Sequence, residues 1–264
     1  MLMVDQSIRF NDGDVYQRTM GVWSQLAGKQ FLDWLALPPG LRWIDIGCGN
    51  GAFTELLIQR CAPAETYGID PSEAQLAFAR DRAAARGANF LQGDALALPL
   101  PNDRFDAAVM ALVIFFLSDP AKGVAEMARV VRPGGTVATY AWDMLDGGFP
   151  WEPIHAEMRE IGITPLLPPT VNASRLDVLR NLWATAGIEA TELRTITVQR
   201  MFVSFEEFWA TTTLAASLQP TLATMTPDAT ERLRAQVRLR LSTDAAGHVV
   251  YPARANAITG RVPL

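Results

Sequence analysis

The residue types best suited to chemistry gather in one short stretch of the chain, LRWIDIGCGNGAFT at positions 41–54. Glycines occupy every second position from 47 to 51, after a short apolar run that contains Asp45. Glycines between a strand and a helix allow a tight turn and a close approach to a ligand, and the helix N-terminus presents unpaired N–H groups. The stretch therefore predicts a loop that holds a nucleotide-like molecule, the alternative being a structural turn that holds none.

The glycines alone leave two kinds of nucleotide open. The first two glycines and Ala52 have the G-x-G-x-x-A spacing of dinucleotide-binding loops, and Asp70 is well placed as the acid that such loops use for the ribose. The third glycine adds the tighter pattern G-x-G-x-G. A carboxylate at Asp45, just before the loop, would repel a pyrophosphate but attract an ammonium group.

A third acid, Asp94, follows a later apolar segment in FLQGDALALP. A carboxylate there can accept a hydrogen bond from an exocyclic amine such as that of adenine. Each acid by itself is commonly a helix cap or a solvated turn residue. Acids at the ends of three consecutive predicted strands, however, meet at the edge where open α/β sheets bind ligands.

Strands alternate with helices through the first 142 residues, which predicts a doubly wound parallel sheet covered on both faces. An amphipathic N-terminal helix precedes Pro38, and the helix that begins at Pro71-Ser72 is expected to end at Gly87 with a left-handed cap. The expected strands are 43–46, a segment ending at 69, 90–92, 105–111 and 136–141. Later in the chain we expect helices at 153–160, 176–187, 205–218 and 227–241, and strands at 192–203 and 248–262.

Composition and charge exclude several classes of protein. The net charge is −5, without a block of Lys or Arg, which argues against nucleic acid or an anionic membrane as a partner. The two cysteines, Cys48 and Cys61, cannot form a disulfide framework, and no zinc-ligand spacing occurs, so no metal is expected. We expect no signal peptide in residues 1–16, because they are polar and acidic, and the longest apolar run, 107–117, is too short to cross a bilayer. We expect a cytoplasmic protein.

Four segments together resemble the successive motifs of the class I S-adenosylmethionine-dependent methyltransferases. They read WIDIGCGNGAFT, TYGIDPSEAQLAFAR, FLQGDALALPLPNDRFDAAVM and MARVVRPGGTV. The chain is most similar to the branch that includes the ubiquinone and menaquinone methyltransferases. The resemblance is specific over residues 43–142 and weaker towards both ends.

The resemblance implies the roles of the site residues. S-adenosylmethionine would be the cofactor and S-adenosylhomocysteine its product, with Asp45 near the ammonium, Asp70 on the ribose hydroxyls and Asp94 on the adenine amine. The other residues implied to contact the cofactor are Gly47, Cys48, Gly49 and Gly51 in the loop, Pro71 and Ala95 at the adenine, Leu112 near the methyl donor, and Tyr16 and Trp23 from the N-terminal helix. Tyr16 and Trp23 are equally well explained as core aromatics.

The resemblance also implies a Rossmann-like sheet of seven strands, mainly parallel, with the last strand antiparallel. Residues 1–142 would contain the N-terminal helix and the cofactor-binding α/β core. Residues 143–264 would supply the last two strands, with mostly helical lid insertions over the substrate pocket.

The expected reaction is in-line transfer of a methyl group to a small, largely apolar acceptor, at oxygen or carbon rather than nitrogen. The segment ALVIFFLSDP lacks the Asn/Asp-Pro-Pro-aromatic signature of amino-group methylation and the acid of metal-dependent catechol-type enzymes. Aromatic residues at 142 and 151 could face the sulfonium. Of the two histidines, His155 is the better candidate for a general base, although a surface or packing role is the more common one for such a histidine.

Two other functions remain open at this point. An NAD-dependent oxidoreductase could use the same loop, and a non-catalytic module could bind the cofactor or its product without transferring methyl. The aromatic residues after position 200 suit either a pocket for an apolar acceptor or internal packing. Nothing in the sequence singles out one acceptor or an oligomeric state.

Overall fold

The structure is a computed structural model that describes residue 15, residues 17–82 and residues 85–264. The described residues form a seven-stranded sheet in the order β3-β2-β1-β4-β5-β7-β6, and β7 runs antiparallel to both of its neighbours, β5 and β6. The strands are β1 Arg42–Ile46, β2 Glu65–Asp70, β3 Ala88–Gln92, β4 Phe105–Ala111, β5 Val131–Trp142, β6 Glu189–Phe202 and β7 Val249–Arg261. The predicted fold class is confirmed.

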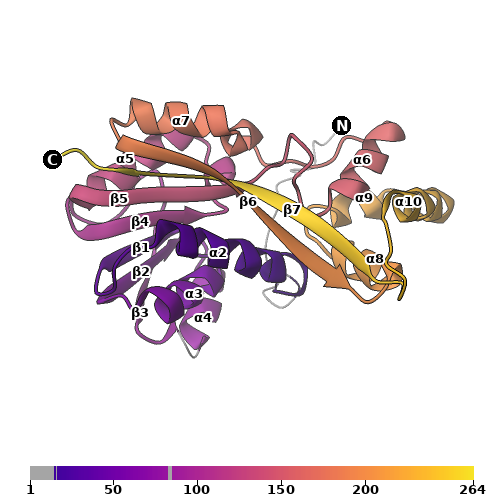
Figure 1. Ribbon diagram of the computed structural model, residues 1–264, viewed down its shortest axis with the longest axis horizontal. Coiled ribbons are helices and arrows are strands. Elements are labelled where there is room, and N and C mark those ends of the chain that lie inside the picture. Colours follow the sequence, from indigo (N-terminus) through magenta and orange to yellow (C-terminus); the bar gives the residue numbers. More distant parts are fainter. Residues whose placement is uncertain (1–14, 16, 83–84) are drawn as a thin grey trace.

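Helices cover both faces of the sheet, α5 and α7 on one face and α2, α3 and α4 on the other (Figure 1). A second group, α6, α8, α9 and α10, lies beyond the end of the sheet (Figure 1). The bounds are α2 Val22–Leu35, α3 Ala52–Cys61, α4 Glu73–Asp81, α5 Pro120–Val130, α6 Glu152–Glu160, α7 Leu176–Thr185, α8 Phe205–Thr212, α9 Gln219–Ala223 and α10 Pro227–Arg240. Short turns of other helix types are η1 Gln17–Gly21, which is a π-helix, η3 Ile114–Phe116 and η4 Val171–Ser174.

The central strands are buried because helices shield both of their faces. β4 has the sequence FDAAVMA, and five of its seven residues are buried. A nearly continuous apolar run of this kind is typical of an internal strand in a parallel sheet. The carboxyl ends of β1, β2, β4 and β5 consequently meet at one edge of a rigid core.

β6 and β7 connect this core to the second group of helices. β7 pairs with β5 only from Ala255 to Arg261, whereas it pairs with β6 along its whole length. The first half of β7 and the last part of β6 therefore extend past the end of β5 as a two-stranded ribbon, which leads to α8 and α10 (Figure 1). We call α6, α8, α9 and α10, with the loops that join them, the lid.

Polar contacts hold the lid together and attach it to the core. Within the lid, the Arg240 guanidinium donates to Glu157, at 2.6 Å, and joins α10 to α6. At the core, Arg254 of β7 forms an ion pair with Asp143, the residue after β5, at 2.7 Å. The side-chain carboxylates of Asp143 and Glu157 are almost inaccessible to water, so each depends on its arginine.

Most predicted elements occur within three residues of their expected bounds, and three differences have local causes. The helix after Ser72 ends at Asp81, and Gly87 does not have a positive φ, so the expected left-handed cap is wrong. β5 begins at Val131 rather than 136, because it pairs with Phe105 before an irregularity in the register. The expected helix 205–218 ends at Thr212, and a new helix starts at Gln219 with Pro220 in its first turn, where proline is tolerated.

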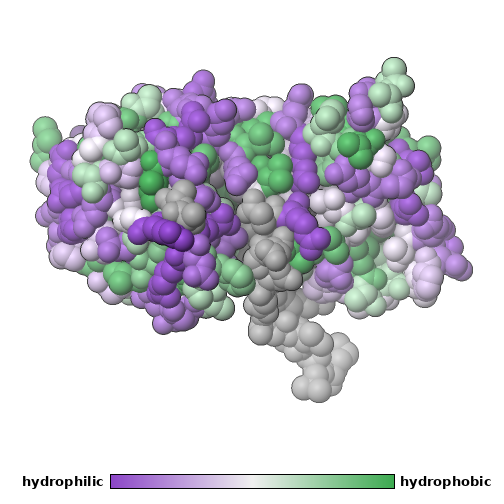
Figure 2. Space-filling view, turned by 90° about the horizontal axis from the view of Figure 1, so that it is seen from below, coloured by the Kyte–Doolittle hydropathy of each residue, from purple (hydrophilic) through white to green (hydrophobic). Residues whose placement is uncertain are grey.

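No helix within the described ranges has both the length and the apolar character needed to span a bilayer. On the face shown in Figure 2, hydrophobic side chains gather in separate patches among hydrophilic ones.

Replacing Arg240 by Met should destabilise the lid. The substitution removes the guanidinium but leaves the carboxylate of Glu157, a residue that is 8% exposed, without this donor. Because Arg240 itself is partly exposed, we expect a loss of about 1–2 kcal/mol in the free energy of unfolding, measured by urea denaturation. The double variant R240M/E157L should recover most of that loss, and a double variant as unstable as R240M would contradict the assignment.

Candidate functional site

The glycine loop after β1 has a backbone that only glycine adopts easily. Gly47, Gly49 and Gly51 have φ values of +75°, +52° and +77°. A Cβ at Gly47 would lie 2.5 Å from Val113, and a Cβ at Gly51 would lie 2.9 Å from the Cβ of Ala79. A Cβ at Gly49 would meet no atom within 4 Å. The first and third glycines thus permit close packing, and the second presents open backbone to a ligand.

Asp70, at the end of β2, binds this loop. Its Oδ2 accepts the Gly49 N–H at 2.9 Å, and its Oδ1 accepts the Ser72 N–H at 2.9 Å. Burial raises the pKa of Asp70, and the two N–H donors offset part of that rise. A carboxylate has about four lone-pair sites, so two remain for further donors such as a pair of hydroxyl groups.

Asp45 lies behind the loop and is completely buried. Its Oδ2 accepts the hydroxyl of Thr54 at 2.6 Å, whereas its Oδ1 has no hydrogen-bond donor. Burial, and to a smaller extent the charge of Asp70, raise the pKa of Asp45 to about 7. A buried carboxylate without a donor favours a positive charge at the loop and disfavours an anion there.

Asp94 stands on the neighbouring strand end. Asp70 is paired in register with Gln92, and the N–H of Gly93 donates to the carbonyl of Asp70 at 3.1 Å. Asp94 is exposed, and its Oδ1 accepts the Leu96 N–H at 2.9 Å. The two acids therefore lie at adjacent strand ends on one edge of the sheet, as the sequence predicts.

Pro71 and Ala95, the residues expected at the adenine, lie next to Asp70 and Asp94 at the same strand ends. Pro71 is exposed directly after β2, and its carbonyl accepts the side-chain amide of Gln92 at 2.9 Å. Ala95 is buried beside Asp94.

Leu112 closes the site from the side of β4. It has a φ of +63°, a left-handed conformation that is strained for a leucine, and its N–H donates to the Tyr140 carbonyl at 2.9 Å. Such strain in a non-glycine residue concentrates at functional sites. The next residue, Val113, packs on Gly47, so the turn after β4 lies against the loop after β1. The strand order reverses between β1 and β4, which makes this the switch point of the doubly wound sheet.

Three other predicted contacts have different outcomes. The Cys48 side chain is buried with Leu76, Ala79 and Phe90, so only its backbone belongs to the loop surface. Trp23 is 1% exposed, and its ring lies 6.4 Å from that of Phe202. That is the environment of a packing residue, and its contact with a cofactor remains a prediction. Tyr16 lies outside the described residues.

His155 is on α6, in the lid, and is 1% exposed. Its ring stacks on Phe149 with centroids 5.3 Å apart. Burial lowers its pKa to about 3, with a smaller contribution from the nearby charge of Arg159. The imidazole is therefore neutral at physiological pH but is a weak proton acceptor, which argues against the predicted role as general base.

The aromatic residues of the lid mainly pack on one another. Phe202 and Phe208 lie 5.2 Å apart edge to face, and Phe205 stacks on Trp209 at 6.3 Å. Trp151 is buried, and its indole N–H donates to Ser217 at 3.3 Å. These contacts favour the packing explanation for the residues after 200.

Three site residues have roles that the sequence pattern did not reveal. Asn50 is buried and stabilises the turn before α3, since its Oδ1 accepts the Ala52 N–H at 3.2 Å. Thr54 binds Asp45, and Val113 fills the space next to Gly47. Thr54 stands between Phe53 and Glu55, so no pattern in the sequence marked it as the buried partner of Asp45.

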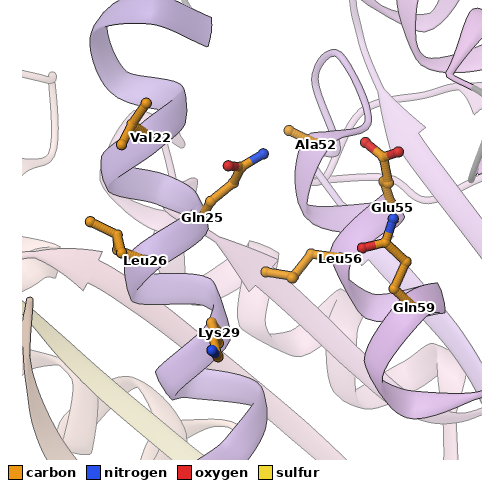
Figure 3. Close-up of a pocket in the computed structure, with 8 residues that line it drawn as sticks. All are labelled: Val22, Gln25, Leu26, Lys29, Ala52, Glu55, Leu56 and Gln59. Carbon is orange, nitrogen blue, oxygen red and sulfur yellow. The ribbon is translucent and has the colours of Figure 1, made fainter.

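A groove of about 440 Å³ runs between α2 and α3 (Figure 3). Gln25 and Leu56 point towards one another across it, and its end reaches Ala52, the first residue of α3 (Figure 3). No group of three or more potential metal ligands occurs among the residues that the structure places.

Comparison with known families identifies one domain. Residues 44–139 match the family model of a methyltransferase domain. Over 95 residues the chain is 40% identical to the chloroplastic 2-methyl-6-phytyl-1,4-hydroquinone methyltransferase 2 of Oryza sativa subsp. japonica, which covers 36% of this chain and 27% of that protein. Over 157 residues it is 31% identical to the 2-phytyl-1,4-naphtoquinone methyltransferase of Synechococcus elongatus. That alignment covers 58% of this chain and 64% of that protein. The chain thus spans less than two thirds of either relative.

The fold also matches a solved structure over nearly the whole chain. The crystal structure of the YcgJ protein from Bacillus subtilis aligns with 90% of this chain and 98% of that chain, with a TM-score of 0.61 and 16% identity. At this identity the match shows a shared fold.

Replacing Gly49 or Gly51 of the loop by alanine should lower the free energy of unfolding by different amounts. Gly51→Ala combines a strained φ with a clash against Ala79, so we expect it to lower the free energy of unfolding by about 1–3 kcal/mol. Gly49→Ala adds strain without a clash and should cost about 1 kcal/mol. Urea denaturation measures both, and equal losses would contradict the packing role assigned to Gly51.

Asp45→Asn should change the pH dependence of stability. The folded protein holds the Asp45 proton to about pH 7, whereas the unfolded chain releases it near 3.8, so the wild type loses stability as pH rises through this window. The asparagine variant lacks that loss. Relative to wild type, its free energy of unfolding should therefore rise by the order of a few kcal/mol between pH 4 and pH 8. A difference that stays constant over this range would show that Asp45 ionises normally.

Proposed function

Because residues 44–139 match the family model of a methyltransferase domain, we propose that this protein transfers the methyl group of S-adenosylmethionine to a small, largely apolar acceptor. One observation carries the proposal. The open backbone at Gly49 lies between the carboxylate of Asp70, which has free lone pairs, and the buried Asp45, whose Oδ1 has no donor. Ribose hydroxyls supply donors for the remaining lone pairs of Asp70, and the charge of the buried Asp45 favours an ammonium group on the loop.

The described residues fit this cofactor at each of its parts. Asp70 would bind the ribose, Asp94 and the backbone of Ala95 the adenine, and the loop from Gly47 to Gly51 the methionine tail. Asp45 would favour the ammonium through the field of its carboxylate. When bound, the cofactor supplies an activated methyl group on a sulfonium.

The protein's own contribution to such a reaction is to position the acceptor and exclude water. We propose that residues 1–142 hold the cofactor and that the lid within residues 143–264 covers the acceptor. Thr170, in the connection from α6 to α7, supports this arrangement, because its hydroxyl lies 2.9 Å from the carbonyl oxygens of both Phe115 and Leu117 in the turn after β4. The chain that leaves the lid after α6 is thereby attached to the turn that follows Leu112.

The acceptor class follows from the lid and the relatives. The lid has a buried aromatic interior, and the relatives named above are methyltransferases of phytylated hydroquinones and naphthoquinones. We propose methylation at oxygen or carbon of an apolar acceptor of similar size, in the cytoplasm and without a metal. A nucleic acid is not the proposed substrate, because the chain is acidic overall.

Two alternative functions predict different ligand binding or activity. A dinucleotide would place its pyrophosphate on the loop in front of the buried Asp45, which disfavours an NAD-dependent oxidoreductase. A non-catalytic module would bind the cofactor and its product equally well but methylate nothing.

Calorimetry with S-adenosylhomocysteine tests the proposal. We expect the wild-type protein to bind S-adenosylhomocysteine and not to bind NAD. Asp70→Asn should weaken binding about 10- to 100-fold, since a hydrogen bond to a charged group contributes about 1.5–3 kcal/mol. Asp177→Asn, a change at an acid on the exposed surface of α7, is the control and should bind like wild type.

Two results would count against this function. One is heat with NAD but none with S-adenosylhomocysteine. The other is equal affinity of the Asp70→Asn variant and the wild type, which would remove Asp70 from the site.

A further inference from the structure

One arginine contacts the glycine loop from the helix beside it. Arg82 is the residue at the C-terminal cap of α4, and its side chain is partly buried. Its Nε donates to the carbonyl of Asn50 in the loop at 2.6 Å, and its Nη1 donates to the carboxylate of Glu55 at 2.9 Å. Glu55 lies in the first turn of α3. The guanidinium therefore joins α4 both to the loop and to the helix that follows the loop.

The contact with Arg82 fixes one peptide unit of the loop. The carbonyl of Asn50 accepts from the guanidinium, and the N–H of Gly51, in the same peptide unit, donates to the carbonyl of Cys48 at 2.9 Å. Because a peptide unit is planar, hydrogen bonds at both of its polar groups determine its orientation. Asn50 directly follows Gly49, where the backbone is open to a ligand. Arg82 thus holds the loop on one side of its open part.

The helix α4 connects this contact to the acid at the end of β2. At the start of the helix, the Ser72 N–H donates to the carboxylate of Asp70, and the Ser72 hydroxyl accepts the N–H of Gln75 at 3.3 Å. In its last turn, the Cβ of Ala79 would lie 2.9 Å from a Cβ added at Gly51. One short helix therefore contacts Asp70 at its start and the glycine loop at its end.

Charge strengthens the contact between Arg82 and the loop. A hydrogen bond from a guanidinium to a carbonyl is stronger than one between neutral groups. The ion pair with Glu55, in which the two side chains are 21% and 23% exposed, keeps the guanidinium in place. Another arginine of the same helix, Arg80, also binds one carboxylate and one carbonyl, those of Glu73 and Phe90, but these partners lie outside the loop.

We propose that Arg82 is a positioning residue of the cofactor site, which holds the glycine loop in the shape that receives the amino-acid tail of the ligand. It acts through the backbone of Asn50 and does not itself contact the ligand. Without the guanidinium, only a fraction of the molecules has the loop in the binding shape, and the apparent affinity falls by that fraction. The inference rests on the proposed function for the identity of the ligand.

Two ligands that differ only in the tail test this role. S-adenosylhomocysteine carries the amino-acid tail, and 5′-methylthioadenosine has the same adenosine and sulfur with a methyl group in place of the tail. Arg82→Met should weaken binding of S-adenosylhomocysteine about tenfold, the lower end of the range for a hydrogen bond to a charged group. Binding of 5′-methylthioadenosine, measured by competition, should stay within about twofold of wild type, whereas a general loss of structure would weaken both ligands alike.

Three further variants assign the effect to the guanidinium. Arg80→Met is the matched control and should bind both ligands like wild type. Arg82→Lys keeps a charged donor without the planar fork and should recover part of the affinity lost in Arg82→Met. The double variant E55Q/R82M should bind S-adenosylhomocysteine no more weakly than R82M, because Glu55 acts through the guanidinium.

Hydrogen exchange of the free protein, followed by NMR, reads the loop without any ligand. In Arg82→Met the amide of Gly51 should exchange about tenfold faster than in wild type, since its peptide unit is no longer held at the carbonyl. The amide of Val109, in the buried strand β4, is the internal reference and should exchange at the same rate. Arg80→Met should leave both rates unchanged.

Three results would overturn the inference. They are wild-type affinity for S-adenosylhomocysteine in a folded Arg82→Met variant, an equal loss for both ligands, and an unchanged exchange rate at Gly51. If Arg82→Met does not fold, Arg82→Lys provides the same comparisons with smaller changes. When wild type binds S-adenosylhomocysteine and one of these results occurs, the inference fails and the proposed function stands. When wild type does not bind it but exchange at Gly51 accelerates in Arg82→Met, the proposed function fails and the hold of Arg82 on the loop remains.

Discussion

The site depends on hydrogen bonds that tie the glycine loop to the end of the neighbouring strand. The N–H groups of Gly47 and Cys48 both donate to the carbonyl of Ile69, at 2.7 and 3.0 Å, and the N–H of Gly49 donates to the carboxylate of Asp70. These bonds fix a left-handed backbone against β2. The loop therefore has its shape independently of any ligand, and the acid that would bind the ribose is also the acid that holds the loop.

Burial gives the acids of the site different properties. Asp45 is enclosed by the core and has one hydroxyl donor, so its pKa is raised to about 7. Asp94 is exposed and binds the backbone of its own turn. Three carboxylates at successive strand ends are thus suited to three different groups of one ligand, a cation, a diol and an amine.

The lid is continuous with the sheet that holds the loop. β7 lies between β5 and β6, and its first half leaves the sheet as part of the ribbon to the lid. The Asp143–Arg254 ion pair and the Thr170 hydroxyl attach the segments before and after α6 to the sheet, near the ends of β5 and β4. A movement of the lid must therefore involve the edge of the sheet at which the methyl group is proposed to be transferred.

The sequence alone determined the order of the strands and helices, the glycine loop, and the placement of Asp45, Asp70 and Asp94 at strand ends. These features follow from local hydrophobic periodicity and from the backbone freedom of glycine, both of which act over a few residues. The alternation of strands and helices then implies a parallel sheet, in which strand ends meet at one edge.

Only the tertiary structure decided which side chains face the ligand and which are packed away from it. The burial of Cys48 and Trp23 depends on partners distant in sequence, and the lowered pKa of His155 depends on its burial in the fold. Trp23, for example, packs on Phe202 and Tyr251, and these contacts form only when the ribbon of β6 and β7 is in place. The physical reason is that desolvation and ring packing depend on all the neighbours of a side chain, and most of those neighbours come from elsewhere in the chain.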